Sequence, residues 1–255
     1  MEKILAIAKV TVLDSFRRKD PYVILILAAL IVFGAGIFSR FGTEGVGKFV
    51  KDVAFTVTGS MAVLVCVITA ARQLPTEIQN RTLYPLLAKP VSRTQVFLGK
   101  FIGVGVMASA VVVLFSLELY LLFKVLGIPV SVVMLQMVYL RIISMWVIAG
   151  LTLSLSVFLS HGANVTVSML LALAMQTFAN TIVTIRTELE GWTLKFFDTV
   201  YWILPHLELF DMSKREVHGW AVAPLWVLAA LTVYGIVYSA IFMSVGMRRF
   251  QTMNL

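Results

Sequence analysis

Six apolar runs divide this sequence and limit the folds that it can adopt. Each run approaches or exceeds the length of about 20 mostly apolar residues that a helix needs to cross a bilayer. Only 13% of the 255 residues are charged and 60% are hydrophobic, whereas soluble domains have about 25% charged residues. We therefore expect an all-α membrane protein with a single transmembrane domain, residues 1–255. The six predicted spans are residues 22–38, 53–71, 96–123, 132–159, 165–183 and 221–247.

The distribution of lysine and arginine predicts the orientation of these spans. If the N-terminus lies in the cytoplasm, the cytoplasmic segments carry twelve lysine and arginine side chains and the external segments carry eight. Such cations favour the cytoplasmic side, so we expect both termini there. The net charge of +8 would suggest nucleic acid in a soluble protein. No basic domain stands apart from the apolar runs, however, and we expect no nucleic-acid partner.

Residues 1–20 are predicted to form an amphipathic helix before the first span. Its charged side chains fall mostly on one side of the helical wheel. The other side carries Ile4, Leu5, Ala8, Val12 and Phe16. A helix of this kind lies in the membrane interface and contacts lipid, although an ordinary basic tail is the alternative. The basic residues that we expect at the membrane surface are Arg17, Arg18, Arg93 and Lys100.

The loop of residues 72–95 is the most informative segment outside the spans. Thr76 and Gln79 match a capping box, a pattern that starts helices, and Pro85 would end the helix that they begin. We therefore predict one short helix, about Glu77 to Tyr84, beneath the membrane. Its exposed side would offer Glu77, Arg81 and Tyr84. This helix is either a docking element for a partner or a well-capped loop without one.

A second capping box opens the third span. Ser92 and Gln95 have the required spacing. Gly99 and Gly103 follow them on one side of the same helix, and small residues with this spacing permit a neighbouring helix to approach closely. We therefore expect helix packing at these two glycines.

This loop resembles the loop signature of bacterial ABC type-2 transporter permeases. In that family an acidic residue precedes a pattern of Thr-Leu, Leu-Leu, Pro-Val-Ser-Arg and Gly-Lys. The corresponding residues here are Glu77, Arg81-Thr-Leu-Tyr-Pro-Leu-Leu87, Lys89-Pro-Val-Ser-Arg93 and Gly99-Lys100. The six-span order, the basic N-terminal helix and the long last external loop extend the resemblance over nearly the whole chain. The subgroup it resembles includes the permeases of nitrous-oxide-reductase maturation and of gliding motility.

The resemblance implies that the short helix is a coupling helix that docks on a separate ATPase. It implies an exporter in the bacterial cytoplasmic membrane, with two ATPase copies and a second copy of this permease or a related one. ATP and magnesium would be bound by the ATPase, and no cofactor is expected in this chain. The turn between spans four and five would form a second contact. The implied docking residues are Glu77, Arg81, Thr82, Leu83, Tyr84, Leu86, Leu87, Ser160, His161 and Gly162.

Two function classes stay open beside an exporter. One is a secondary transporter or channel without an ATPase, for which we would expect inverted repeats and matched midplane charges. The other is a membrane anchor for an extracytoplasmic assembly. Membrane lipids are expected partners in each case, and an extracytoplasmic accessory protein is a further candidate.

Glu118 and Arg141 are the two charged residues predicted to lie inside the membrane, since Lys100 is counted with the cytoplasmic cations at the start of its span. Each would cost at least ~2.5 kcal/mol if it were isolated in the membrane. Because they lie in consecutive spans joined by a short turn, we predict that they form an intramembrane ion pair. A substrate or proton path is the alternative.

The segment of residues 184–220 is predicted to be the longest external loop. It is rich in tryptophan, phenylalanine and tyrosine, which sit at the headgroup level of membranes. We expect one or two short external helices before span six, broken at Pro205, as an aromatic belt or a route of substrate exit. His206, Glu208, Asp211 and His218 carry metal-ligating groups, but their spacing matches no defined site, so we predict no metal.

Overall fold

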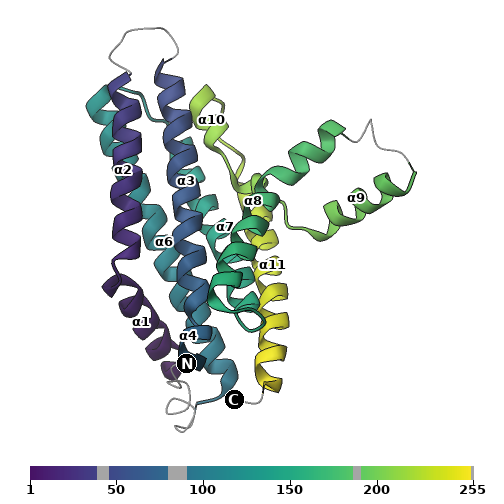
Figure 1. Cartoon of the computed structure of the whole chain (residues 1–255). Helices are drawn as coiled ribbons and strands as arrows, with labels where there is room; N and C mark the ends of the chain where they lie inside the picture. The colour runs from purple at the N-terminus through teal and green to yellow at the C-terminus, as the bar shows by residue number, and fades with distance from the viewer. Residues whose placement is uncertain (39–45, 80–90, 186–190, 254–255) are drawn as a thin grey trace.

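The computed structural model describes residues 1–38, 46–79, 91–185 and 191–253. Every regular element in these ranges is a helix, and the long helices pack side by side in a bundle (Figure 1). The helices are α1 (Glu2–Arg17), α2 (Asp20–Phe38), α3 (Val46–Arg72), α4 (Pro75–Gln79), α6 (Arg93–Leu126), α7 (Val133–Leu155), α8 (His161–Ile185), α9 (Gly191–Ile203), η3 (Leu207–Phe210), α10 (Ser213–His218) and α11 (Leu225–Thr252).

The bundle has two distinct ends. The start of α1 and the end of α11 lie near α4 at one end, which we call the α4 end, and α10 lies at the opposite end, the α10 end (Figure 1). Helix α9 stands away from the bundle in the same view. The common position of the termini agrees with an even number of passes through the bundle.

Four segments are long and apolar enough to cross a membrane: Val46–Gln79, which contains α3 and α4, and the helices α6, α7 and α11. Helix α2 contains a shorter apolar stretch, Pro21–Gly34. The chain is therefore an all-helical membrane protein with at least these candidate spans in its described residues. Six crossings, which would add α2 and α8, remain a prediction.

The helix boundaries follow local chemistry. The capping box of Ser92 and Gln95 is confirmed, because the Ser92 side chain accepts from the Gln95 N–H and the Gln95 side chain accepts from the Ser92 N–H. Helix α6 ends at Gly127, whose φ of 69° favours glycine. The first predicted box is wrong in register: α4 begins at Pro75, so Thr76 lies inside the first turn. Proline suits the first helical position because its missing N–H would have no partner there.

Helix α11 starts later than its predicted span. The span was expected from residue 221, but the helix begins at Leu225. Gln136 explains the difference: its side chain donates to the Ala223 carbonyl and accepts from the Ala223 N–H, both at 2.9 Å. This clamp holds the chain in an extended form until Pro224, where the helix can begin.

Helix α1 packs on α6 across the two glycines of the predicted packing face. A Cβ added at Gly99 would lie 2.8 Å from Ile7, and one added at Gly103 would lie 2.6 Å from Thr11 Cβ. The buried face of α1 consists of Ala8, Thr11 and Ser15. Leu5 of the predicted apolar face is 61% exposed, as a side chain that faces lipid would be, so the interfacial position of this helix stays a prediction. The close approach of α1 to α6 requires small side chains on the buried face of α1, and a hydrophobic pattern does not reveal this requirement.

Gly103 provides a test of this contact. Alanine at position 103 should lower the melting temperature of the protein in detergent, because overpacking a tight contact costs about 1–3 kcal/mol. Alanine at Gly34 is the matched control, since nothing lies within 4 Å of a Cβ added there. The control should be neutral or stabilising, because alanine favours helix over glycine by about 1 kcal/mol. Equal melting temperatures for the two variants would contradict the close α1–α6 contact.

Candidate functional site

A buried ion pair fixes α10 to the bundle at the α10 end. The Lys51 ammonium of α3 donates to Glu216 Oε1 of α10 at 2.9 Å, and the Glu216 side chain is fully buried. The Ser131 N–H donates to the same carboxylate at 3.1 Å, and the Ser131 hydroxyl also bonds to it. One carboxylate thus joins α3, α10 and the turn before α7. Lys51 and Glu216 lie in two different segments between the predicted spans, and only their opposite charges could have suggested this pair.

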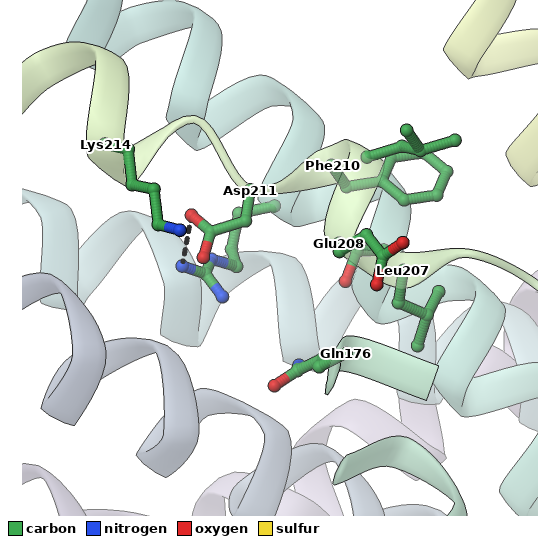
Figure 2. A pocket seen from close by; sticks show the side chains of 9 residues that line it. Gln176, Leu207, Glu208, Phe210, Asp211 and Lys214 are labelled. Carbon is green, nitrogen blue, oxygen red and sulfur yellow. Dashed lines mark hydrogen bonds and ion pairs between the residues drawn. The ribbon is translucent and has the colours of Figure 1, made fainter. Parts of the chain in front are cut away.

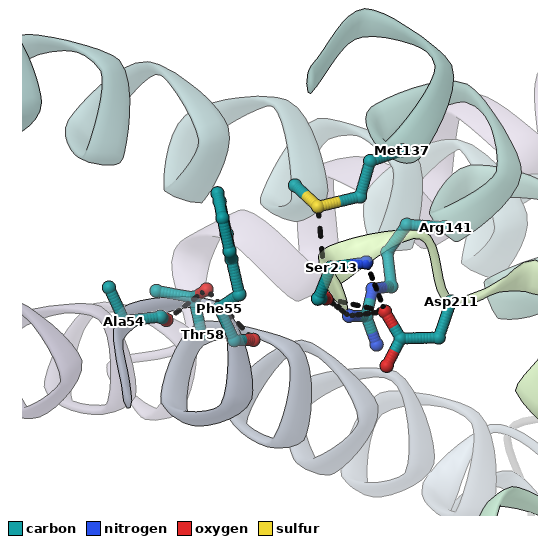
Figure 3. Close-up of polar contacts among 7 residues, drawn as sticks. All are labelled: Ala54, Phe55, Thr58, Met137, Arg141, Asp211 and Ser213. Atoms are coloured by element: carbon teal, nitrogen blue, oxygen red, sulfur yellow. Dashed lines mark hydrogen bonds and ion pairs between the residues drawn. The ribbon is translucent and has the colours of Figure 1, made fainter. Parts of the chain in front are cut away.

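Arg141 reaches from α7 to the segment between η3 and α10. Its guanidinium lies 3.4 Å from Asp211 Oδ1 and 3.5 Å from the Ser213 hydroxyl (Figure 3). Asp211 also accepts the Ser213 N–H at 2.9 Å. The guanidinium lies over Gly59 of α3, where an added Cβ would be 2.8 Å from one of its nitrogens. A glycine at this position therefore gives the charged group its room.

The predicted ion pair of Glu118 and Arg141 is wrong. Arg141 pairs with Asp211, and no ion pair joins it to Glu118 within the described residues. Glu118 instead lines a groove with side chains of α2. Because adjacency of helices in sequence does not fix their rotation about their axes, the two side chains point to different neighbours.

A polar cavity lies beside Arg141 at the α10 end. Its volume is about 460 Å³, and its lining comes from α7, α8, η3 and α10 (Figure 2). Two cationic and two anionic side chains line it, so their formal charges balance: Arg141, Lys214, Glu208 and Asp211. Gln176 of α8 adds an amide. Such a cavity can hold water or a polar group.

His206 joins the external segment to α11. Its backbone N–H donates to the Tyr234 hydroxyl at 2.9 Å, and its ring packs edge-on against Tyr201 at 4.3 Å. Burial lowers the pKa of His206 below its usual value, which favours the neutral form of the ring. The described residues contain no group of three metal-ligating side chains that could hold an ion.

Glu77 and Lys100 form an ion pair at the α4 end. The Lys100 ammonium of α6 lies 2.6 Å from Glu77 Oε1 of α4, and the Lys100 side chain is only 3% exposed. The prediction that Lys100 lies at the membrane surface is therefore wrong. Glu77, expected to offer its charge to a partner, is held within the chain. The pair fixes the start of the predicted docking segment to α6.

Arg93 caps the last turn of α11. Its guanidinium donates to the carbonyls of Phe250, Gln251 and Met253 at 3.1, 3.0 and 2.6 Å. A cation at this position satisfies carbonyls that have no partner within the helix and complements the helix dipole. Arg93 was predicted to contact the membrane surface, but these carbonyls occupy its guanidinium. Arg93, three residues after the segment 80–90, is therefore bound to the end of α11.

The other predicted surface residues lie at the end of α1. Arg17 is exposed in the last turn, and Arg18 pairs with Asp14 at 3.2 Å. At the turn between α7 and α8, Ser160 and Gly162 are exposed and His161 is partly buried. The remaining predicted docking residues, Arg81, Thr82, Leu83, Tyr84, Leu86 and Leu87, lie outside the described residues.

The turn before α8 is ordered by a buried amide. The Asn164 side chain donates to the Thr152 carbonyl of α7 at 3.1 Å and accepts from the Ser168 hydroxyl at 2.9 Å. Asn164 is fully buried. Its hydrogen bonds hold the exposed Ser160 and Gly162 in a fixed position at the α4 end, where a partner protein could contact them.

The four long apolar segments indicate an integral membrane protein. A family model described as an ABC-2 family transporter protein matches residues 16–189, more than half of the chain. The chain therefore belongs to the ABC-2 family, as a membrane permease domain and non-catalytic transport subunit. Permeases of this family generally pair with an ABC ATPase. Comparison with individual curated proteins gave no match.

The Lys51–Glu216 pair allows a double-mutant test. Glu216→Gln should destabilise the protein by about 3–5 kcal/mol, because it leaves the Lys51 charge buried without its counter-ion. Adding Lys51→Met should recover much of this loss, since glutamine can still accept the Ser131 N–H. Unfolding free energies in detergent would measure both effects. A double variant no more stable than Glu216→Gln alone would argue against the pair.

The Glu77–Lys100 pair predicts an asymmetry between its two members. Glu77→Gln should cost more stability than Lys100→Met, because the Lys100 side chain is 3% exposed and Glu77 is 34% exposed. Water can solvate the carboxylate left by Lys100→Met, whereas the ammonium left by Glu77→Gln stays buried, at a cost of about 2–5 kcal/mol. Melting temperatures in detergent would test this order, and the reverse order would show that the two side chains are not paired as described.

Proposed function

We propose that this chain is the permease subunit of an ATP-binding-cassette exporter in a bacterial cytoplasmic membrane. It dimerises with a second copy or a related permease, and two copies of a separate ATPase dock at the α4 end. Closure of the ATPases on ATP and magnesium then switches the spans between inward- and outward-facing states. The single observation that carries this proposal is the family match over residues 16–189.

The contacts at the α4 end support coupling at this place. The segment 80–90 is preceded by α4, which Glu77 ties to α6 through Lys100, and followed by Arg93, which caps α11. A displacement of this segment would therefore act on α6 and α11 together. These contacts, rather than a charge offered by Glu77, are our basis for coupling.

The proposed topology has six crossings with both termini in the cytoplasm. Helices α2 and α8 would complete the four long apolar segments. The α4 end would then be cytoplasmic, in line with the excess of lysine and arginine there. From the resemblance of residues 77–100 we also propose that the chain belongs to the subgroup that includes the permeases of nitrous-oxide-reductase maturation and of gliding motility. The second copy and an extracytoplasmic accessory protein are parts of the same proposal.

Site-specific photo-crosslinking would test the docking proposal. A photoreactive amino acid at Gln79 or Ser160, both exposed at the α4 end, should crosslink to a protein with an ABC ATPase sequence in native membranes. Val132 is the matched control, because it is 64% exposed but follows the α6–α7 turn at the α10 end. It should give no ATPase crosslink.

Two outcomes would contradict the proposal. If neither Gln79 nor Ser160 crosslinks to an ATPase, a secondary transporter or a membrane anchor becomes the better description. If Val132 crosslinks and the other two do not, the ATPase docks at the opposite end and the proposed topology is inverted.

A further inference from the structure

Glu118 is a charged residue in a candidate membrane span, and it has no counter-ion among the described residues. No ion pair involves it, and its Oε2 atom is buried without a hydrogen-bond partner in the same part of the chain. Ionisable side chains inside membranes are costly and usually mark functional sites. Because Arg141, the predicted partner, pairs with Asp211 instead, the carboxyl group of Glu118 requires another explanation.

Glu118 is one of the residues that line an apolar groove of about 510 Å³ between α2 and α6. All other lining side chains are apolar: Leu25, Ile26, Ala29, Leu30, Phe33, Leu121, Leu122 and Val125. Ile26, Leu30 and Phe33 are 58%, 63% and 60% exposed, so the groove opens on the outer surface of the bundle. Helix α2 contains no charged residue after Asp20 and cannot supply a counter-ion.

The position of Glu118 along α6 places it near a membrane surface. Helix α6 has 34 residues, which gives a length of about 51 Å at 1.5 Å per residue. This exceeds the hydrocarbon core of about 30 Å, so the helix extends beyond the core. Glu118 precedes the last residue, Leu126, by eight positions, about 12 Å along the axis. If α6 extends equally at both ends, the carboxyl group lies near the boundary between headgroups and hydrocarbon.

We propose that this groove binds an amphiphile that carries a protonated amine on a hydrocarbon chain. The amine would pair with Glu118, and the chain would lie against the apolar side chains of α2 and α6. A lipid without a cationic group would leave the carboxyl group of Glu118 unpaired, and one that carries only negative charge would be repelled. A metal ion would find only one carboxylate, fewer oxygen ligands than magnesium or calcium requires. The ammonium amphiphile is the occupant that satisfies both the charge and the apolar walls.

Photolabelling of the purified full chain in dodecyl maltoside would test this site. The probe is dodecylamine with a diazirine at mid-chain, protonated at pH 7 as a lysine side chain is, and the matched probe is the corresponding alcohol. The amine should label peptides of residues 25–33 and 117–125 about tenfold more than the alcohol, the preference expected for a charge-assisted hydrogen bond. Glu118→Gln should abolish the preference, and Glu118→Asp should retain it.

An internal control lies elsewhere on the same surface. A groove of about 420 Å³ lined by Leu98, Trp146 and Ile236, among others, contains no charged side chain, so both probes should label it equally. Glu118→Gln should fold normally, because it removes an unpaired charge, and size-exclusion chromatography would verify this. Equal labelling of the α2–α6 groove by both probes, or a preference unchanged in Glu118→Gln, would overturn the proposal. The proposal would also be overturned if the groove were labelled in the monomer but not in a dimer of the chain, because a second copy would then be the occupant.

This inference does not rest on the proposed ATPase. The labelling experiment uses the isolated permease, so its failure would leave the crosslinks from Gln79 and Ser160 untouched. Conversely, the absence of an ATPase would leave the labelling preference of Glu118 unchanged. The two proposals can therefore fail separately.

Discussion

The absence of a hydrophobic driving force between helices in lipid is the constraint on which this structure depends. Contact between two apolar helix surfaces in lipid gives no hydrophobic free energy. Close packing at small residues and polar contacts must therefore determine which helices are neighbours. Gly99 and Gly103 bring α1 onto α6. Gly235 and Gly246 do the same for α11 on α7, against Ile143 and Ser154. The arrangement of the bundle follows from these few positions.

Charged side chains act under the same constraint at both ends of the bundle. The Lys51–Glu216 pair joins α3 to α10 at one end, and the Glu77–Lys100 pair joins α4 to α6 at the other. A charge without such a partner is expensive in an apolar bundle. The chain therefore uses its few charged residues to connect segments distant in sequence. Among the described residues Glu118 has no such connection, which is why we propose a ligand from outside the chain for it.

Sequence patterns predicted local features well and pairings poorly. The capping box of Ser92 and Gln95 depends on residues three apart, so spacing alone was sufficient. The partner of Arg141 depends on the orientation of α7 about its axis relative to α3, and on where the segment after η3 packs on the bundle. Asp211 is 70 residues away in the chain, and no local pattern relates the two. The same reason explains why the buried partner of Lys51 was missed.

The long apolar runs were sufficient to predict an all-helical membrane protein, because uncovered backbone polar groups are not tolerated in lipid. The loop pattern of residues 77–100 also indicated the family without any structure. The pairs that the charged side chains form could be seen only in the folded chain, because ion pairs require distances of a few ångströms between side chains on different helices. Lys100, which was predicted to lie at the membrane surface, forms a buried pair with Glu77. The tertiary structure also separates Glu118 from Arg141, since the rotation of each helix is fixed by its neighbours and not by its own sequence.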